Sequence, residues 1–261
     1  MNIKSYQQFF GRYVKGFLTR ASDKDREVLA LKVVHSQKVR ALMKLLSKRE
    51  GLLKYDIFLA ELSGLFHDIG RFEQFKKYHT FLDLKSEDHA GLSVKILKKE
   101  KVLDNLTYND REIVLDSIFV HNKFSIPSDF KGKKLIISKL LRDADKIDIW
   151  RVFNDFYERG INSDDINLGL PLGKDISDKV YKDLLAEKIV NIRDVKNQLD
   201  FMVMRLSWLY DINFYESLKE IINRKYLDTI FKNIPQGDKK ELIVKKITSF
   251  LKEKDRKRVL K

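Results

Sequence analysis

Apolar residues recur every three or four positions along most of the chain, which is the spacing of one face of an α-helix. This pattern predicts helices over a series of segments, at residues 4–19, 24–48, 55–67, 87–99, 108–121 and 134–158. The last of these has a clear set of candidate core positions, Ile137, Leu140, Leu141, Ile147 and Trp150. The sequence shows no internal repeat and no alternation typical of a β-strand. We therefore predict an all-α protein.

The ends of these helices are predicted from capping and turn-forming residues. The helix over 55–67 runs into Asp68-Ile69-Gly70, and Gly is the usual residue at a helix C-terminus. Residues 71–85 are aromatic and charged without a clear period, which predicts a loop. Ser86 is the predicted N-cap of the helix that follows.

The strongest boundary lies between Gly160 and Asp175, where GINSDDINLGLPLGKD contains three Gly and one Pro. Amphipathic segments follow it near residues 176–190, 194–211, 214–232 and 238–254. The chain is thus predicted to have three parts: an N-terminal helix (1–24), a helical domain (25–160) and a C-terminal helical extension (161–261). The extension carries no motif that we can use; it could cap a site, mediate a homodimer or complete the bundle.

The amino-acid composition limits the kinds of metal site and binding partner that the chain can have. There is no Cys, so any metal site must be built from His, Asp and Glu. No run of about 18 apolar residues occurs, which predicts a cytoplasmic protein without a membrane segment. The net charge of +14 could attract nucleic acid, but Lys far outnumbers Arg and the charges are scattered along helix faces. A solvated surface is therefore the favoured interpretation.

Four of the five His occur about 20 to 30 residues apart in helix-like segments, at His35, His67, His89 and His121. A bundle in which each helix directs one imidazole inward can enclose a dinuclear metal site. Asp68 directly follows His67, and its two oxygens can bridge two cations. Asp145 lies in RDADKIDIW on an apolar-faced helix, where a buried carboxylate needs a cation. Asp143 and Asp148 are interpreted as salt-bridge partners of Lys or Arg.

The order of these residues resembles the HD-domain superfamily of metal-dependent phosphohydrolases over about residues 25 to 155. The resemblance is carried by several local sequences, LALKVVHSQKV, LSGLFHDIGRFEQF, SEDHAGLSVKIL, IFVHNKFSIP and KLLRDADKIDIW. It implies an HD-domain helical bundle whose mononuclear core is His35, His67, Asp68 and Asp145. His89 and His121 resemble the additional ligands of dinuclear members, and Asp68 would bridge the metals. Asp145 is preferred to Asp143 because the Ala-Asp-Lys triplet matches the family's terminal ligand.

The predicted function is hydrolysis of a phosphomonoester or phosphodiester, in a nucleotide or related small phosphate ester, by a metal-activated water. The imidazoles favour Mn, Fe, Co, Ni or Zn over Mg, with two ions expected. HD-like di-iron oxygenases resemble the chain in ligand order and remain an alternative, and a nuclease or nucleic-acid-binding protein is less favoured. The cyclic-di-GMP-cleaving branch is not supported, because Asn-Lys-Phe-Ser-Ile-Pro follows His121 in place of that branch's second His and Gly-Tyr-Pro signature.

Further side chains are candidates for contact with substrate. Arg71 and Lys123 are predicted to act with Asp68 in catalysis by binding phosphate, and Lys146 could do the same. An aromatic group could form a pocket wall or simply pack onto the bundle: Phe72, Phe75, Tyr78 and Phe81. His79 is a possible substrate contact, and Glu73 and Asp88 could orient ligand imidazoles.

Overall fold

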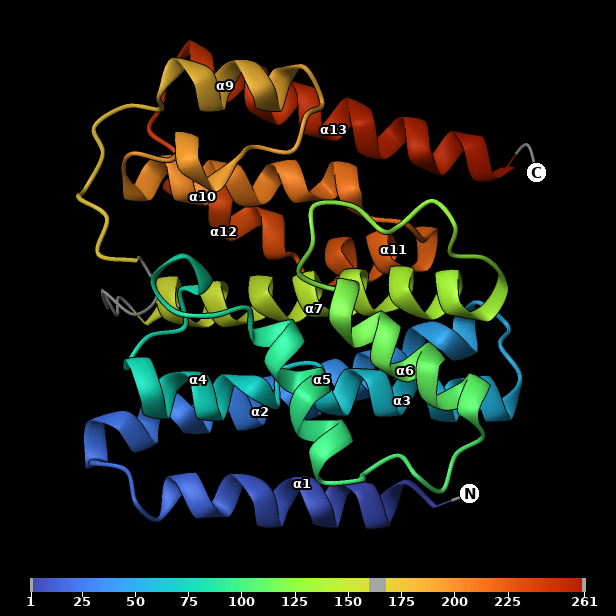
Figure 1. The fold of residues 1–261 in the computed structure, drawn as a ribbon. Helices are drawn as coiled ribbons and strands as arrows, with labels where there is room; N and C mark the ends of the chain where they lie inside the picture. The colour runs from blue at the N-terminus through green and yellow to red at the C-terminus, as the bar shows by residue number, and fades with distance from the viewer. Residues whose placement is uncertain (1, 160–167, 260–261) are drawn as a thin grey trace. The chain divides into compact units, whose positions relative to one another are not determined.

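The computed structural model describes residues 2–159 and 168–259, and every regular element in these ranges is helical (Figure 1). The all-α prediction is confirmed. The chain divides into two compact units, Met1–Asp148 and Ile149–Lys261. The boundaries predicted after residues 24 and 160 stay predictions, and residues 160–167 of the predicted break lie outside the described residues.

The first unit contains α1 (Ile3–Leu18), α2 (Asp23–Arg49), α3 (Lys54–Phe66), α4 (Gly70–Tyr78), α5 (His89–Lys99), α6 (Tyr108–Val120) and the first part of α7 (Gly132–Glu158). A short 3-10 turn, Asp83–Lys85, lies between α4 and α5. The predicted core positions of α7 are all fully buried.

Helix α3 is the buried centre of this unit, because almost all of its residues from Asp56 to Phe66 are shielded from solvent. It packs against α2, where Met43 and Leu46 are fully buried. Gly64 permits this approach, since a Cβ at Gly64 would lie 3.0 Å from the Cα of Arg40. The C-terminus of this helix is therefore fixed in the core, and His67 is its C-cap.

The predicted loop over residues 71–85 is wrong in its first half, which forms α4. Phe72 and Phe75 lie three residues apart and both are buried, so the helix has an apolar face too short to give a recognisable period. Phe72 packs against Phe10 and Phe17 of α1, with ring centroids 6.1 and 5.8 Å away. Packing against α1 therefore stabilises a helix that the local apolar pattern does not predict.

Gly70 begins α4 and does not end α3, which corrects the sequence interpretation. Its role is close approach: a Cβ at this position would lie 2.5 Å from the carbonyl oxygen of His89 and 2.6 Å from the amide nitrogen of Ser93. The Gly70 amide donates to Ser93 Oγ at 2.9 Å. Only Gly lets α4 start directly against α5.

We expect Gly70→Ala to lower the free energy of unfolding by about 1–3 kcal/mol, because the added methyl group would overlap the backbone of α5. Denaturant unfolding followed by circular dichroism would measure this. Gly11→Ala is the matched control, since a Cβ at Gly11 in α1 meets nothing within 4 Å. Equal effects of the two substitutions would contradict the steric argument.

The N-cap of α5 is Asp88 and not the predicted Ser86. The Asp88 carboxylate accepts from the Gly91 amide at 3.3 Å. Ser86 instead belongs to the loop before α5, where its hydroxyl donates to the Leu82 carbonyl and accepts from Gln74 Nε2. Both residue types can cap a helix, so local sequence did not distinguish them.

The second unit contains the end of α7 with α9 (Asp178–Leu185), α10 (Gln198–Ser207), α11 (Tyr215–Asn223), α12 (Tyr226–Asn233) and α13 (Asp238–Val259). The amphipathic segment predicted over 214–232 is two helices, interrupted where Lys225 adopts a left-handed φ of 56°. In α10, every residue from Leu199 to Ser207 is buried.

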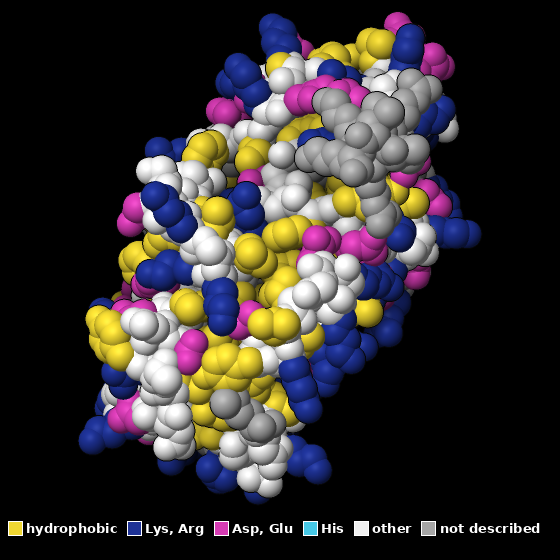
Figure 2. Space-filling model, turned by 90° about the vertical axis from the view of Figure 1, so that its right-hand side faces the viewer, with side chains coloured by type: hydrophobic (Ala, Val, Ile, Leu, Met, Phe, Trp, Pro, Cys, Tyr) yellow, Lys and Arg dark blue, Asp and Glu magenta, His cyan; other side chains and the backbone are white. Residues whose placement is uncertain are grey.

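None of the helices in residues 2–159 and 168–259 is both long and apolar enough to cross a bilayer. Figure 2 shows Lys and Arg side chains over much of the visible face, interspersed with Asp and Glu. The face in view therefore matches the scattered charge expected from sequence.

Candidate metal centre

The six predicted ligands come from five helices of the first unit. His35 lies on α2, His67 is the C-cap of α3 and Asp68 follows it. His89 is the first residue of α5, His121 is the C-cap of α6, and Asp145 lies on α7. All are buried except Asp145, whose side chain is 18% exposed. The helical bundle thus brings together residues that are up to 110 positions apart in the chain.

Asp68 lies at the centre, and its two carboxylate oxygens face different pairs of imidazoles. Oδ2 is 3.7 Å from His35 Nε2 and 3.8 Å from His67 Nε2. Oδ1 is 3.4 Å from His89 Nε2 and 4.0 Å from His121 Nε2. Within each pair the two Nε2 atoms are 3.2 and 3.1 Å apart. This is the arrangement needed for one carboxylate to bridge two cations.

Asp145 joins the first pair. Its Oδ1 is 3.1 Å from His35 Nε2 and 3.6 Å from His67 Nε2. Potential ligand atoms of these three residues all lie within 4.8 Å of one another, as do those of His67, Asp68 and His121. A third such group is Asp83, Asp88 and His89, and the fully buried Asp143 belongs to none of the three. The geometry therefore favours Asp145 over Asp143 as a ligand.

Each imidazole is oriented by an oxygen at its Nδ1. The Nδ1 atoms of His67 and His121 lie 2.9 Å from the Gly64 carbonyl and 2.6 Å from the Ile118 carbonyl. Because a carbonyl only accepts, these two Nδ1 atoms carry the proton and their Nε2 lone pairs point into the cluster. The Nε2 atom of His121 lies 3.1 Å from that of His89, and two lone pairs at this distance repel one another unless a proton or a metal ion lies between them.

Carboxylates orient the other two imidazoles, and sequence reasoning missed this. His35 Nδ1 is 2.8 Å from Asp148 Oδ2. Asp148 therefore contacts the imidazole of a predicted ligand, a contact that its predicted salt bridge to Lys or Arg did not include. His89 Nδ1 is 2.7 Å from Asp83 Oδ2. Asp148 lies three residues after Asp145, so it shares a helix face with it, and that spacing could have indicated its role.

Glu73 and Asp88, predicted to orient imidazoles, have other partners. Glu73 is 3.7 Å from Lys76, and Asp88 caps α5 and pairs with Lys123. No local signal pointed to Asp83, because its position depends on contacts made by Gln74 and Asn122. Gln74 Nε2 donates to Asp83 Oδ1 at 2.8 Å, and Asn122 Nδ2 donates to its Oδ2 at 3.2 Å.

Two cations lie against Asp68. Arg71 Nε is 3.4 Å from Oδ1, which places this predicted residue beside the cluster. Lys32, which the sequence analysis did not single out, donates to Oδ2 at 3.0 Å. The Lys32 ammonium and the Arg71 guanidinium lie 5.3 and 5.9 Å from the centre of the Phe81 ring. Lys32 is one helical turn before His35, and this spacing was the available signal.

Lys123 is held away from Asp68 by its own partners. Its ammonium donates to Asp88 Oδ2 at 2.6 Å and lies 4.9 Å from the centre of the Phe119 ring. Lys146, next to Asp145 on α7, is half-buried. The phosphate contacts predicted for these two lysines stay predictions.

Of the predicted aromatic wall, only Phe81 contacts the cations beside Asp68. Phe75 packs on Phe81 with ring centroids 4.9 Å apart, whereas Phe72 belongs to the core against α1. His79 is exposed at the end of α4 and borders a different cavity of about 500 Å³, which Tyr13 and other residues line.

The electrostatics of the cluster keep its carboxylates ionised. Burial alone would raise the pKa of Asp68, but the charges of Lys32 and Arg71 and the adjacent imidazoles hold this pKa well below its usual range. Contacts with the His35 and His67 imidazoles do the same for the pKa of Asp145, against the effect of its burial. The cluster therefore offers anionic oxygens to a cation at neutral pH.

The imidazoles divide into two kinds. Burial lowers the pKa of His121 to about 3 and also lowers the pKa of His89. For His35, burial is outweighed by the hydrogen bonds of Asp145 and Asp148, which raise its pKa to about 9. His89 and His121 are thus neutral at pH 7, whereas His35 would have to release a proton to bind a metal.

The backbone around His121 is fixed by a buried arginine. Arg142 of α7 donates to the carbonyls of His121 at 3.4 Å and Phe124 at 3.3 Å. These carbonyls follow the C-terminal end of α6, where the helix itself leaves acceptors unpaired.

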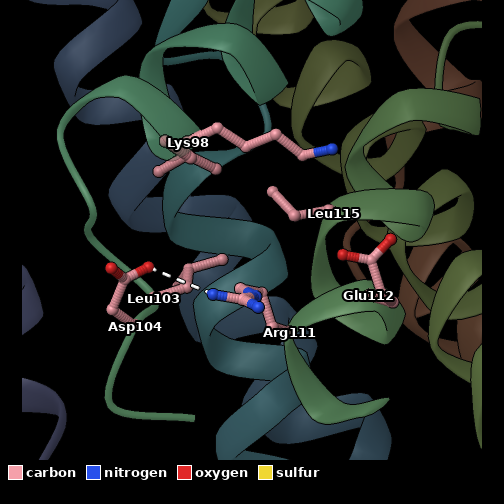
Figure 3. A pocket seen from close by; sticks show the side chains of 7 residues that line it. Lys98, Leu103, Asp104, Arg111, Glu112 and Leu115 are labelled. Carbon is pink, nitrogen blue, oxygen red and sulfur yellow. Dashed lines mark hydrogen bonds and ion pairs between the residues drawn. The ribbon is translucent and has the colours of Figure 1, made fainter. Parts of the chain in front are cut away.

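A cavity of about 240 Å³ lies between α5 and α6, away from the predicted ligands, and none of the predicted site residues lines it (Figure 3). There, Arg111 donates to Asp104 at 3.2 Å.

Comparison with known protein families shows a match over the part of the chain that contains the cluster. A family model described as the HD domain matches residues 33–150, a segment that includes all six predicted ligands. Neither the curated proteins nor the solved structures give a match.

Proposed function

We propose, because residues 33–150 match the HD-domain model, that the protein is a metal-dependent phosphohydrolase with two divalent transition-metal ions. The substrate would be a phosphomonoester or phosphodiester in a nucleotide or a related small phosphate ester. When bound, the ions supply a water of lowered pKa and positive charge for the phosphoryl oxygens.

The observation that supports this proposal best is the position of Asp68 between two pairs of imidazoles. His35, His67 and Asp145 would hold one ion together with Oδ2 of Asp68. His89 and His121 would hold the second with Oδ1. The donors are imidazole nitrogens and carboxylate oxygens, a set that suits Mn, Fe, Co, Ni or Zn better than Mg.

The residues around Asp68 would bind and orient the substrate. Lys32 and Arg71 lie on the two carboxylate oxygens, so both cations are within a few ångströms of the place where a phosphoryl group would sit. Each could donate charge-assisted hydrogen bonds to phosphate oxygens. Asp148 and Asp83 would keep His35 and His89 in the orientation that ligation needs.

The proposal is tested by assaying phosphate release from an aryl phosphate, and aryl alcohol release from a bis-aryl phosphodiester, with Mn, Co or Zn. Turnover of either ester that stops on chelation supports it. The alternative di-iron oxygenase would consume oxygen with Fe(II) and release no phosphate. That result would reject the proposed reaction while retaining the ligands.

We expect protein purified without chelators to contain about two transition-metal ions per chain, and His89→Ala or His121→Ala to lower this toward one. Only one imidazole pair is altered, so the ion bound by His35, His67 and Asp145 should remain. Elemental analysis by mass spectrometry would measure the content. Wild-type protein without metal, or variants with unchanged content, would contradict the assignment.

A further inference from the structure

Arg205 is a fully buried cation in the second unit. It lies on α10, a helix whose residues from Leu199 to Ser207 are all shielded from solvent. Arg is almost never fully buried unless it is paired with an anion or a set of acceptors. Neither the metal centre nor the proposed reaction uses this residue.

Aromatic rings cover the guanidinium of Arg205. Its central carbon is 2.9 Å from the ring centre of Phe153 and 4.3 Å from that of Phe201, and Tyr157 is also close at 5.9 Å. Rings interact with the face of a guanidinium, but its N–H groups lie in the plane and point outward at the edge. All three nitrogens are buried, and none makes a hydrogen bond of normal geometry to a described residue; the Tyr157 hydroxyl interacts only weakly with the guanidinium.

The buried carboxylates of this unit have other partners. Asp200 accepts from the Ser177 amide and hydroxyl, Asp183 from Lys179 and Glu220 from Arg224. Within residues 149–159 and 168–259, no ion pair includes Arg205. The chain as described therefore supplies rings for this cation but no counter-charge.

Two more unpaired donors lie on the helix that faces Arg205. Trp150 Nε1 is buried without a hydrogen-bond partner, and the buried Tyr157 hydroxyl has only its weak interaction with Arg205, so its proton is not donated. Both residues share a face of α7 with Phe153 because they are three and four residues from it. The Trp150 ring packs on Trp208, one turn after Arg205, with centroids 5.9 Å apart. The cluster is thus rich in N–H and O–H groups that need an acceptor.

Burying these donors without acceptors costs free energy. Contact with aromatic faces recovers part of the hydration that a buried guanidinium loses, but it leaves the in-plane donors unpaired. Burial lowers the pKa of Arg205 to about 9, so the group is still charged at neutral pH. A charged group with unpaired donors is stable in a core only when an anion completes it.

We propose that Arg205, with Trp150 and Tyr157, forms an internal binding site for a small oxyanion. The ligand has at least two oxygens that can accept from one guanidinium edge, as in inorganic phosphate or a carboxylate. Because Arg205 and Trp150 are fully buried, the anion exchanges only when the helices separate locally, and binding is slow. This site is independent of the proposed phosphohydrolase reaction.

Intrinsic fluorescence tests the proposal, because the only two Trp of the chain, Trp150 and Trp208, both lie in this cluster. Metal-loaded protein is titrated with sodium phosphate, and separately with sodium acetate, at constant ionic strength set with sodium chloride. We expect a saturable change in fluorescence and, at about 100-fold excess over Kd, a melting temperature raised by about 5 °C. Response to acetate alone would identify a carboxylate as the ligand.

Variants separate this site from phosphate bound at the metal centre. Arg205→Met should lose the fluorescence response while remaining at least as stable as wild type without added anion. Arg205→Lys keeps the charge but not the planar pair of donors, so its Kd should rise at least about tenfold. The matched control is Arg142→Met, which removes a buried Arg that does have acceptors. It should lose stability in every buffer and keep the response.

Wild-type protein whose fluorescence responds to neither anion would overturn the proposal, as would an equal response in Arg205→Met. Destabilisation of Arg205→Met to the same extent as Arg142→Met, with no anion effect on wild type, would show a purely structural arginine. If Arg205→Met does not fold, the wild-type and Arg205→Lys titrations decide by the same criteria.

Discussion

Asp68→Asn is expected to reduce phosphohydrolase activity by several orders of magnitude while the helical content stays near that of wild type. The Asp68 carboxylate offers one oxygen to each imidazole pair, at 3.4 to 4.0 Å from their Nε2 atoms. An amide has a single good ligand oxygen and no charge, so it cannot hold two cations at a fixed separation. The attacking water then loses both its activation and its position.

The same substitution removes the counter-charge of two neighbouring cations. Lys32 and Arg71 both lie on the Asp68 carboxylate, and a neutral amide would leave them beside the remaining metal. We therefore expect metal content to fall together with activity. This links the loss of turnover to the loss of the bridge rather than to unfolding.

Asp116→Asn is the matched control, because Asp116 on α6 is a carboxylate that pairs with Lys134 and belongs to none of the three potential metal groups. Both variants should be assayed with saturating Mn on the aryl phosphate, with circular dichroism and metal analysis alongside. Similar activity losses in the two variants would reject the ligand assignment. Full activity of Asp68→Asn would reject the two-metal mechanism.

The sequence was sufficient to place the ligands on helices because each lies within or at the end of a segment with clear helical spacing. His35 and Asp145 belong to long helices whose buried faces are visible in the apolar pattern. The pairing of His67 with Asp68 was recognisable only through the family resemblance, since one His-Asp pair is common. Local pattern and resemblance together therefore predicted the cluster.

The surroundings of the ligands could not be predicted in the same way, because they depend on contacts between segments. Asp83 is held beside His89 by Gln74, Arg71 and Asn122, each at least nine residues away in the sequence. Gly70 resembled a helix end, whereas its actual constraint is the backbone of α5. The contacts that fix Asp83 and Gly70 therefore cannot be predicted from the spacing of apolar residues around them.

Arg205 illustrates the same limit in the second unit. Its neighbours in the sequence, Met204 and Leu206, indicate a buried helix, but an isolated Arg in such a segment is normally expected to reach solvent. Burial of this side chain without an acceptor depends on Phe153 and Phe201 packing over it. Such an arrangement becomes visible only when both helices are placed.

Removal of the metal ions is expected to lower the melting temperature by about 10 °C or more while the helices persist below that temperature. A ligand present at about 1,000 times its Kd stabilises the folded state by about 4 kcal/mol, and two sites contribute more. For a chain of this size, each kcal/mol corresponds to about 2–4 °C. Chelation removes this contribution.

The helices should survive because the metal-free cluster is partly compensated. Lys32 lies 3.0 Å from Asp68, and His35 lies 3.1 Å from Asp145, so each carboxylate keeps a positive or hydrogen-bonding neighbour. What remains uncompensated is the second pair, in which the Nε2 atoms of His89 and His121 face each other at 3.1 Å. This pair should contribute most to the loss of stability.

Calorimetry of wild-type protein before and after chelation, with metal removal verified by elemental analysis, measures the effect. His89→Ala is the matched control: it already lacks the facing pair that should contribute most, so chelation should lower its melting temperature by less than half as much as in wild type, because one ion instead of two is lost. An unchanged wild-type melting temperature after complete metal removal would show that the cluster does not couple metal binding to folding. A full decrease in His89→Ala would instead assign the stabilisation to the ion held by His35, His67 and Asp145 alone.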